Sequence, residues 1–113
     1  MKYFFKLCEF ADEEAPWLNE LPLSKISFVN KKPLCASGAF SVVNLTVYFE
    51  PDLPAMEFSN IVHELRHAWQ YKKYGKLRYF FAKTFMRKRL EQDAWNWEEK
   101  SLYWITAKEG MNK

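Results

Sequence analysis

The chain has 113 residues, of which 49% are hydrophobic and 19% aromatic, and it carries a formal net charge of +3. This length and this supply of large apolar side chains suit one folded domain over residues 1–113 and exclude an intrinsically disordered protein. No apolar run approaches the roughly 18 to 20 residues of a membrane span, and Lys6 and Glu9 place charges near the N-terminus. We therefore expect a soluble cytoplasmic protein with no signal peptide and no membrane partner.

The N-terminal part of the chain has few regular patterns. Residues 3–10 fit a strand or a helix equally well. Asp12–Leu21 combines early acidic residues, apolar residues at helical spacing and a proline near its first turn, so it predicts a short helix that Pro22 ends. Cys8 and Cys35 match no metal-binding or redox spacing, which favours buried thiols.

The next part of the chain has the composition of strands. Lys25–Asn30 alternates polar and apolar residues and predicts a strand followed by a turn. Leu34–Val43 and Leu45–Phe49 are rich in β-branched and aromatic residues, and Asn44 between them predicts a hairpin turn. Gly38 marks a bulge or a close approach by another part of the chain.

Two long helices are expected after these strands. Asp52 is the predicted N-cap of the first helix, with Pro54 in its first turn, and Gly75 is the predicted residue that ends it after Tyr74. Between these limits the helical period is carried by Phe58, Ile61, Val62, Leu65, Ala68 and Trp69. A second helix over Leu77–Lys108, continuous or broken along the way, completes an α+β fold in which a small, mostly antiparallel sheet packs against both helices.

The first of these helices contains the pattern H-E-x-x-H, formed by His63, Glu64 and His67. Residues four apart lie one above the other on a helix, so both imidazoles can bind a single zinc ion. Glu64 is turned about 100° from His63, where its carboxylate can take a proton from a metal-activated water. The two histidines of this motif are the only histidines of the chain, which strengthens the prediction of a metal site.

A catalytic zinc site needs a third protein ligand, and here it has to be an acid. The candidates in the second helix are Glu91, Asp93, Glu98 and Glu99. Glu91 and Glu98 share one helical face, whereas Asp93 is turned about 200° from Glu91. We predict Glu91 as the ligand. Glu98 would then suit a role orienting a ligand imidazole, or be itself the ligand if the register differs. A solvated helix face is the other interpretation of these acids, and it is the favoured one for Glu98 and Glu99.

The motif residues resemble a known group of enzymes. The segment His63–Gln70, followed 24 residues after His67 by Glu91–Ala94, is similar to the gluzincins, in particular to minimal single-domain ones with an H-E-L-x-H-x-x-Q helix and a later glutamate helix. The resemblance covers residues 45–98 and implies a zincin-like fold. It also implies a small mixed sheet whose edge strand, within Leu45–Phe49, lines the cleft and pairs with an extended peptide substrate. Relatives often carry an acid four residues after the ligand glutamate, where this chain has Trp95.

The charge of the chain is unevenly distributed. Between Leu65 and Leu90 there are nine lysines and arginines and no acidic residue, interleaved with tyrosines and phenylalanines. Lysine and arginine are ordinary on exposed helix faces, and we expect most of these aromatic side chains to pack the helices against the sheet. The segment could also bind nucleic acid, but this interpretation is not favoured. A third interpretation is that its charges attract acidic peptide substrates toward the cleft.

These observations predict a zinc metallopeptidase that hydrolyses peptide bonds of a protein or peptide substrate, with Glu64 as general base and His63, His67 and Glu91 as Zn²⁺ ligands. The alternative is a non-catalytic zincin-like scaffold whose basic segment from Leu65 to Leu90 contacts nucleic acid or an acidic protein. No motif marks the residue that would stabilise an oxyanion, for which the candidates are Tyr71, Tyr74 and Tyr103.

Overall fold

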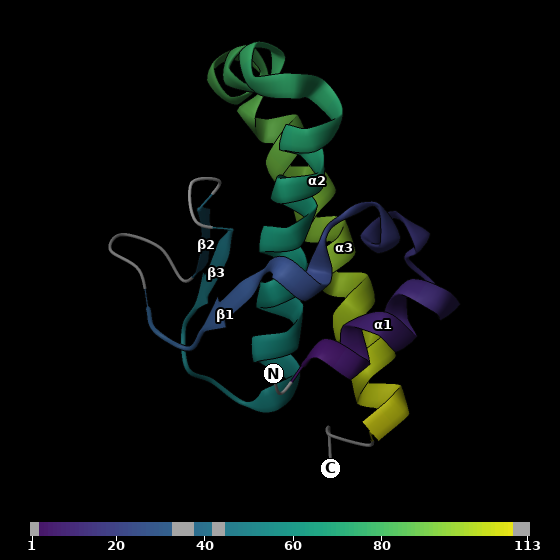
Figure 1. Ribbon diagram of the computed structural model, residues 1–113. Helices are drawn as coiled ribbons and strands as arrows, with labels where there is room; N and C mark the ends of the chain where they lie inside the picture. The colour runs from purple at the N-terminus through teal and green to yellow at the C-terminus, as the bar shows by residue number, and fades with distance from the viewer. Residues whose placement is uncertain (1–2, 33–37, 42–44, 110–113) are drawn as a thin grey trace.

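The computed structural model describes residues 3–32, 38–41 and 45–109. It has the predicted α+β architecture, with a small sheet and two long helices. In chain order the elements are α1 (Phe4–Glu13), the 3₁₀ helices η1 (Pro16–Glu20) and η2 (Leu23–Lys25), strands β1 (Ser27–Val29), β2 (Gly38–Ser41) and β3 (Thr46–Phe49), and helices α2 (Pro54–Phe85) and α3 (Arg87–Glu109). Figure 1 shows α3 running back alongside α2, with the sheet on one side of this pair and α1 on the other.

The sheet has the order β1-β3-β2 and is mixed, as the resemblance implies, rather than mostly antiparallel. The predicted hairpin pairing is confirmed, because β2 runs antiparallel to β3 and places Gly38 opposite Phe49. β1 runs parallel to β3 on its other side. Leu45–Phe49 therefore supplies the central strand, and the expectation that it forms an edge is wrong. The turn predicted at Asn44 and residues 34–37 lie outside the described residues.

The N-terminal segment is helical. Residues 3–10, which fitted either a strand or a helix, belong largely to α1, and Leu7 and Phe10 bury one face of that helix. The single helix predicted over Asp12–Leu21 is wrong in extent, because α1 ends at Glu13 and the 3₁₀ helix η1 begins at Pro16. A proline has no N–H to donate and forces the residue before it out of helical geometry, so the chain restarts in a different direction.

The buried carboxylate of Glu57 accepts hydrogen bonds from several residues around the start of α2. The predicted N-cap Asp52 is wrong: the N-cap position belongs to Leu53, which makes no side-chain cap. The backbone N–H of Asp52 instead donates to Oε2 of Glu57 at 3.0 Å. Glu57 also accepts hydrogen bonds from the hydroxyl of Tyr3 and from Nδ2 of Asn30, the latter at 3.2 Å. One carboxylate therefore joins the N-terminus, the end of β1 and the first turn of α2.

Gly75 breaks the first long helix, as predicted. Its φ of 79° and ψ of 166° lie in a region that is essentially restricted to glycine, and they kink α2. Residues 76–85 continue as a helix in a new direction. Met86, at φ −126° and ψ 30°, separates them from α3, so the helix expected over Leu77–Lys108 is broken once. The two breaks return the chain toward the sheet, and α3 packs along α2 (Figure 1).

Aromatic side chains from distant parts of the chain form the centre of the core. Phe10 packs edge-on against Phe58 with ring centroids 5.9 Å apart, and Phe58 stacks on Trp104 at 5.8 Å. These contacts join α1, α2 and α3. Cys8 is half-buried and free, in keeping with an unpaired thiol, while Cys35 lies outside the described residues. Among the helices described, none combines the length and the apolar character needed to cross a membrane.

Candidate metal centre

Two imidazoles and a carboxylate converge where α3 passes α2. The rings of His63 and His67, on successive turns of α2, have centroids 4.9 Å apart. Oε1 of Glu91 lies 2.5 Å from Nε2 of His67 and 3.8 Å from Nε2 of His63. One ligand atom of each residue lies within 4.8 Å of the other two. Ligand atoms of a single zinc ion lie roughly 3 to 4 Å apart, so this group is a candidate metal site.

The ring of His63 is oriented by Glu98. Nδ1 of His63 lies 2.8 Å from Oε1 of Glu98, on the side of the ring away from Nε2. This contact is a close charge contact that lacks the geometry of a hydrogen bond. A carboxylate beside Nδ1 favours the proton on that nitrogen and leaves Nε2 to face the site. Burial acts to lower the pKa of His63, but the contact with Glu98 and the charges of Glu64 and Glu91 outweigh it and raise that pKa. Glu98 thus occupies the orienting position, and the exposed Trp95 does not.

The ring of His67 is oriented by a buried amide. Nδ1 of His67 lies 2.8 Å from Oε1 of Gln70. The amide nitrogen of Gln70 donates to the carbonyl oxygen of Leu90 at 3.0 Å and to Oδ2 of Asp93 at 2.9 Å, so its oxygen is the atom that faces the ring. An amide oxygen accepts, which places the proton of His67 on Nδ1 as well. Both imidazoles therefore present Nε2 to the same point.

An ion pair fixes α3 against α2 beside this amide. Nε of Arg66 donates to Oδ2 of Asp93 at 2.7 Å, and Nη2 donates to Oδ1 at 3.2 Å. The guanidinium lies over the ring of Trp69, 3.8 Å from its centroid. Burial acts to raise the pKa of Asp93, but the bonds from Arg66 and Gln70 outweigh it and hold that pKa below its ordinary value. Since Asp93 follows Glu91 by two residues, this pair also sets the position of the proposed ligand.

Sequence reasoning missed this ion pair. In the sequence, Arg66 belongs to the basic segment and Asp93 faces away from Glu91 on the helix, and neither feature indicates that the two residues pair. The spacing of His67 and Gln70, three apart on one helical face, was the available signal for a polar partner of the ligand. Glu99, the remaining acid considered, is exposed, as predicted.

Glu64 lies beside the candidate metal centre, and its side chain contacts the sheet. Its Oε2 is 4.0 Å from Nε2 of His63. A Cβ added to Gly38 of β2 would lie 2.9 Å from that same oxygen, so the close approach predicted at Gly38 is confirmed. Burial raises the pKa of Glu64 to about 7, with His63 opposing the shift and Glu91 and Glu98 adding to it. A carboxylate with this pKa can exchange a proton near neutral pH.

A tyrosine that the sequence did not single out lies near these acids. Tyr79, in the helical segment beyond the Gly75 kink, is half-buried, and burial together with the charges of Glu64 and Glu91 raises its pKa. Its hydroxyl therefore stays protonated as a hydrogen-bond donor. Tyr71 packs edge-on against Tyr79 with ring centroids 5.5 Å apart.

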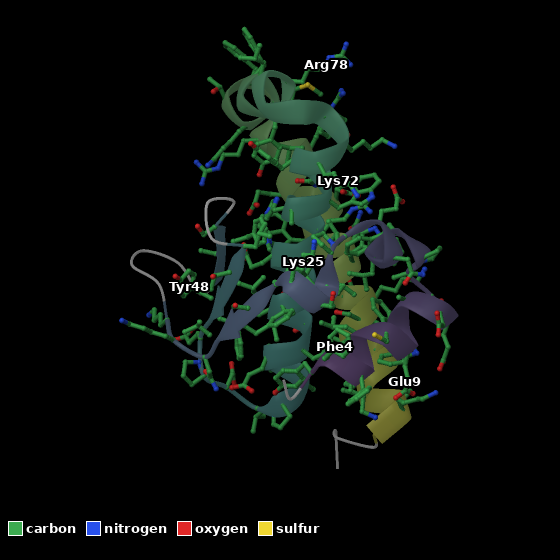
Figure 2. The ribbon with its side chains drawn as sticks, in the orientation of Figure 1. Phe4, Glu9, Lys25, Tyr48, Lys72 and Arg78 are labelled. Atoms are coloured by element: carbon green, nitrogen blue, oxygen red, sulfur yellow. The ribbon has the colours of Figure 1, made fainter. Side chains whose placement is uncertain are left out.

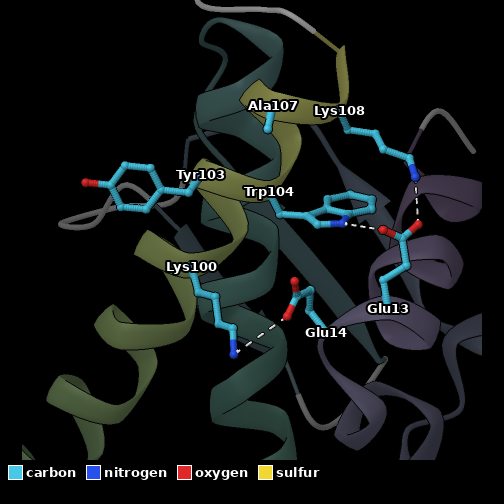
Figure 3. Close-up of a pocket in the computed structure, with 7 residues that line it drawn as sticks. All are labelled: Glu13, Glu14, Lys100, Tyr103, Trp104, Ala107 and Lys108. Carbon is cyan, nitrogen blue, oxygen red and sulfur yellow. Dashed lines mark hydrogen bonds and ion pairs between the residues drawn. The ribbon is translucent and has the colours of Figure 1, made fainter.

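The predicted candidate Tyr103 lies elsewhere. It lines a hollow of about 450 Å³ between the end of α1 and the last turns of α3 (Figure 3). It lies twelve positions after Glu91 on the same helix, which is about 18 Å along the axis. The charged groups of this hollow pair with one another: Lys108 lies 2.7 Å from Glu13, and Lys100 lies 3.9 Å from Glu14. Tyr103 therefore does not belong to the candidate metal centre.

Comparisons with known proteins identify no relative. No protein-family model matches the chain, and neither a curated protein sequence nor a solved structure matches it. The candidate metal centre is accordingly assigned from its own residues and their geometry.

Proposed function

We propose that this protein is a zinc-dependent metallopeptidase of the gluzincin type. The observation that carries the proposal is the convergence of His63, His67 and Glu91, with both imidazoles oriented so that Nε2 faces the same point. Two imidazoles and one carboxylate are a donor set of catalytic zinc, which leaves a position for substrate or water. The same donor set also suits non-haem iron, but the buried carboxylate of Glu64 beside it favours hydrolysis.

A bound zinc ion would supply Lewis acidity toward a peptide carbonyl and make a water molecule easier to deprotonate. Glu64 would accept that proton on its carboxylate and pass it to the leaving amine. The hydroxyl of Tyr79, whose pKa is raised by burial and by the charges of Glu64 and Glu91, is a candidate donor to a developing oxyanion. The edge strand β2, whose Gly38 touches Glu64, would pair with the extended backbone of the substrate.

A site of three ligands favours catalysis over a purely structural metal. Structural zinc sites normally have four protein ligands, and among the described residues the group contains three. The alternative of a non-catalytic scaffold gives no role to Glu64. The two functions therefore differ in whether the carboxylate of Glu64 is required.

Metal analysis and a cleavage assay test the proposal together. Purified protein should contain about one zinc per chain, and His63→Ala or His67→Ala should lose it. Glu64→Gln should keep the metal and lower kcat on peptides selected from a degenerate library by about 10²- to 10⁴-fold. Glu99→Gln, which changes an exposed acid of α3, is the matched control and should keep both. Full activity in Glu64→Gln, or iron in place of zinc, would overturn the proposal.

A further inference from the structure

The outer end of the α2–α3 pair exposes a row of large apolar side chains. Leu77, Phe81 and Phe85 are 77%, 67% and 76% exposed. They are spaced four apart and so lie on one face of the helical segment 76–85. Phe81 and Phe85 stack on each other, with ring centroids 6.1 Å apart and planes at 22°. The expectation that the aromatic residues of the basic segment mainly pack the helices against the sheet is wrong for these two.

Exposed positive charges lie in the same part of the chain as this apolar row. Arg78, Lys83 and residues 87–89 are exposed, and within the described part of the chain none of them pairs with a carboxylate. No acidic residue occurs between Leu65 and Leu90 to neutralise them. Figure 2 shows Arg78 at the outermost end of the molecule, beyond Lys72 and far from the sheet and α1. We call residues 72–89 the hairpin tip.

We propose that the hairpin tip docks on an anionic membrane surface. A helix with an apolar face flanked by lysines and arginines lies in the interface of a bilayer, with its apolar side chains among the acyl chains and its cations near lipid phosphates. The tip projects beyond the rest of the molecule, so a flat surface can contact it without meeting the sheet, and Phe81 and Phe85 within the tip are exposed. We expected no membrane partner because no segment could span one, but interfacial docking needs no span.

Other occupants fit these residues less well. A nucleic acid would satisfy the cations, but it offers no apolar phase to Leu77 or to the outward faces of two rings already stacked on each other. A second copy of the chain would satisfy the apolar row, but it would bring two groups of unpaired cations together. The bilayer surface supplies both the apolar phase and the negative charge.

Vesicle binding of the full chain tests the proposal. Sedimentation with phosphatidylcholine vesicles that contain about 30% phosphatidylserine should show binding that falls as salt is added, and pure phosphatidylcholine vesicles should bind at least about tenfold more weakly. The double variant Phe81→Ser/Phe85→Ser should lose at least about tenfold in its partition coefficient on the anionic vesicles. Phe5→Ser, which changes an equally exposed phenylalanine of α1, is the matched control and should bind like the wild type.

Because both changed side chains are exposed, the double variant should unfold at the same temperature as the wild type. A loss of binding would then not be caused by unfolding. Anionic vesicles that do not bind, or that bind the double variant as well as the wild type, would overturn the proposal. So would tighter binding of single-stranded DNA of about 20 nucleotides than of the vesicles. A dimer in solution that the double variant converts to a monomer would assign the apolar row to self-association instead.

Discussion

Replacing Gly38 by alanine tests the position of Glu64 without touching a charge or a proposed ligand. The added Cβ would lie 2.9 Å from Oε2, 3.2 Å from Cγ and 3.3 Å from Cδ of Glu64. Gly38 does not have a positive φ, so alanine adds no backbone strain and acts through space alone. Ordinary van der Waals contact begins near 3.4 Å, which requires the Glu64 carboxylate to move by about 0.5 Å.

A shift of this size predicts a measurable loss of activity. Because a 1 Å misplacement of a reacting group can cost about 10²-fold in rate, a shift of half that size should lower kcat by about tenfold. Zinc content should stay unchanged, since the proposed ligands lie on α2 and α3 and not on β2. The assay is steady-state cleavage of the best library peptide by protein whose metal content has been measured.

Two further variants make the result specific. Ala39→Ser changes the neighbouring residue of β2, whose side chain points to the other face of the sheet, and should leave kcat unchanged. Glu64→Asp withdraws the carboxylate by one methylene, so adding Gly38→Ala to it should cost less than in the wild type, and the two effects should not add. Wild-type kcat in fully loaded Gly38→Ala would refute the reasoning that Glu64 acts from its contact with β2.

Other substitutions test how the rest of the structure supports this site. Asp93→Asn should weaken zinc affinity by roughly tenfold, measured by competition with a chelator, because Arg66 no longer fixes α3. The pKa of Asp93 is held below its ordinary value, so its charge stabilises the fold above pH 3.8 and this stabilisation disappears as pH falls further. Thermal melts should therefore show the wild type losing stability below that pH more steeply than Asp93→Asn. Glu57→Leu should lower the free energy of unfolding in urea by about 2 kcal/mol, because buried donors that include the Tyr3 hydroxyl lose their acceptor; an unchanged midpoint would contradict this. Gly75→Ala should cost roughly 1–3 kcal/mol in the same assay, since alanine is strained at a φ of 79°, and a value near zero would mean that the kink straightens freely.

Local periodicity determined much of what the sequence predicts correctly. The spacing of His63 and His67 places both on one face of a helix whatever that helix packs against, because the geometry lies within a single turn. The same reasoning placed Glu91 and Glu98 on one face of the next helix. Gly38 indicates a bulge or a close approach and Gly75 a helix break, because glycine has few other uses inside a strand or helix.

Contacts between elements could not be predicted in this way. The partners of Glu98 and Asp93 lie on α2, 35 and 27 residues earlier in the chain, and they meet because two breaks turn α3 back along α2. A helical angle states which residues share a face, but not which of them a neighbouring helix will reach. Glu57 replaced Asp52 at the entry to α2 for the same reason, since its partners come from the N-terminus and the end of β1.

In the basic segment, too, some properties follow from the sequence and others only from the tertiary structure. Its charge and its aromatic content are visible in the sequence, and the helical period marks Leu77, Phe81 and Phe85 as one face. Whether that face is buried depends on where the kink at Gly75 directs the segment, and the tertiary structure directs it away from the sheet. The sequence thus determined which residues of this protein can bind a metal and which side chains share one face of a helix, because both follow from spacing along one helix. Only the packing of α3 on α2 decided which acid joins the candidate metal centre, which acid lies against the other side of His63 and which apolar face is left to solvent.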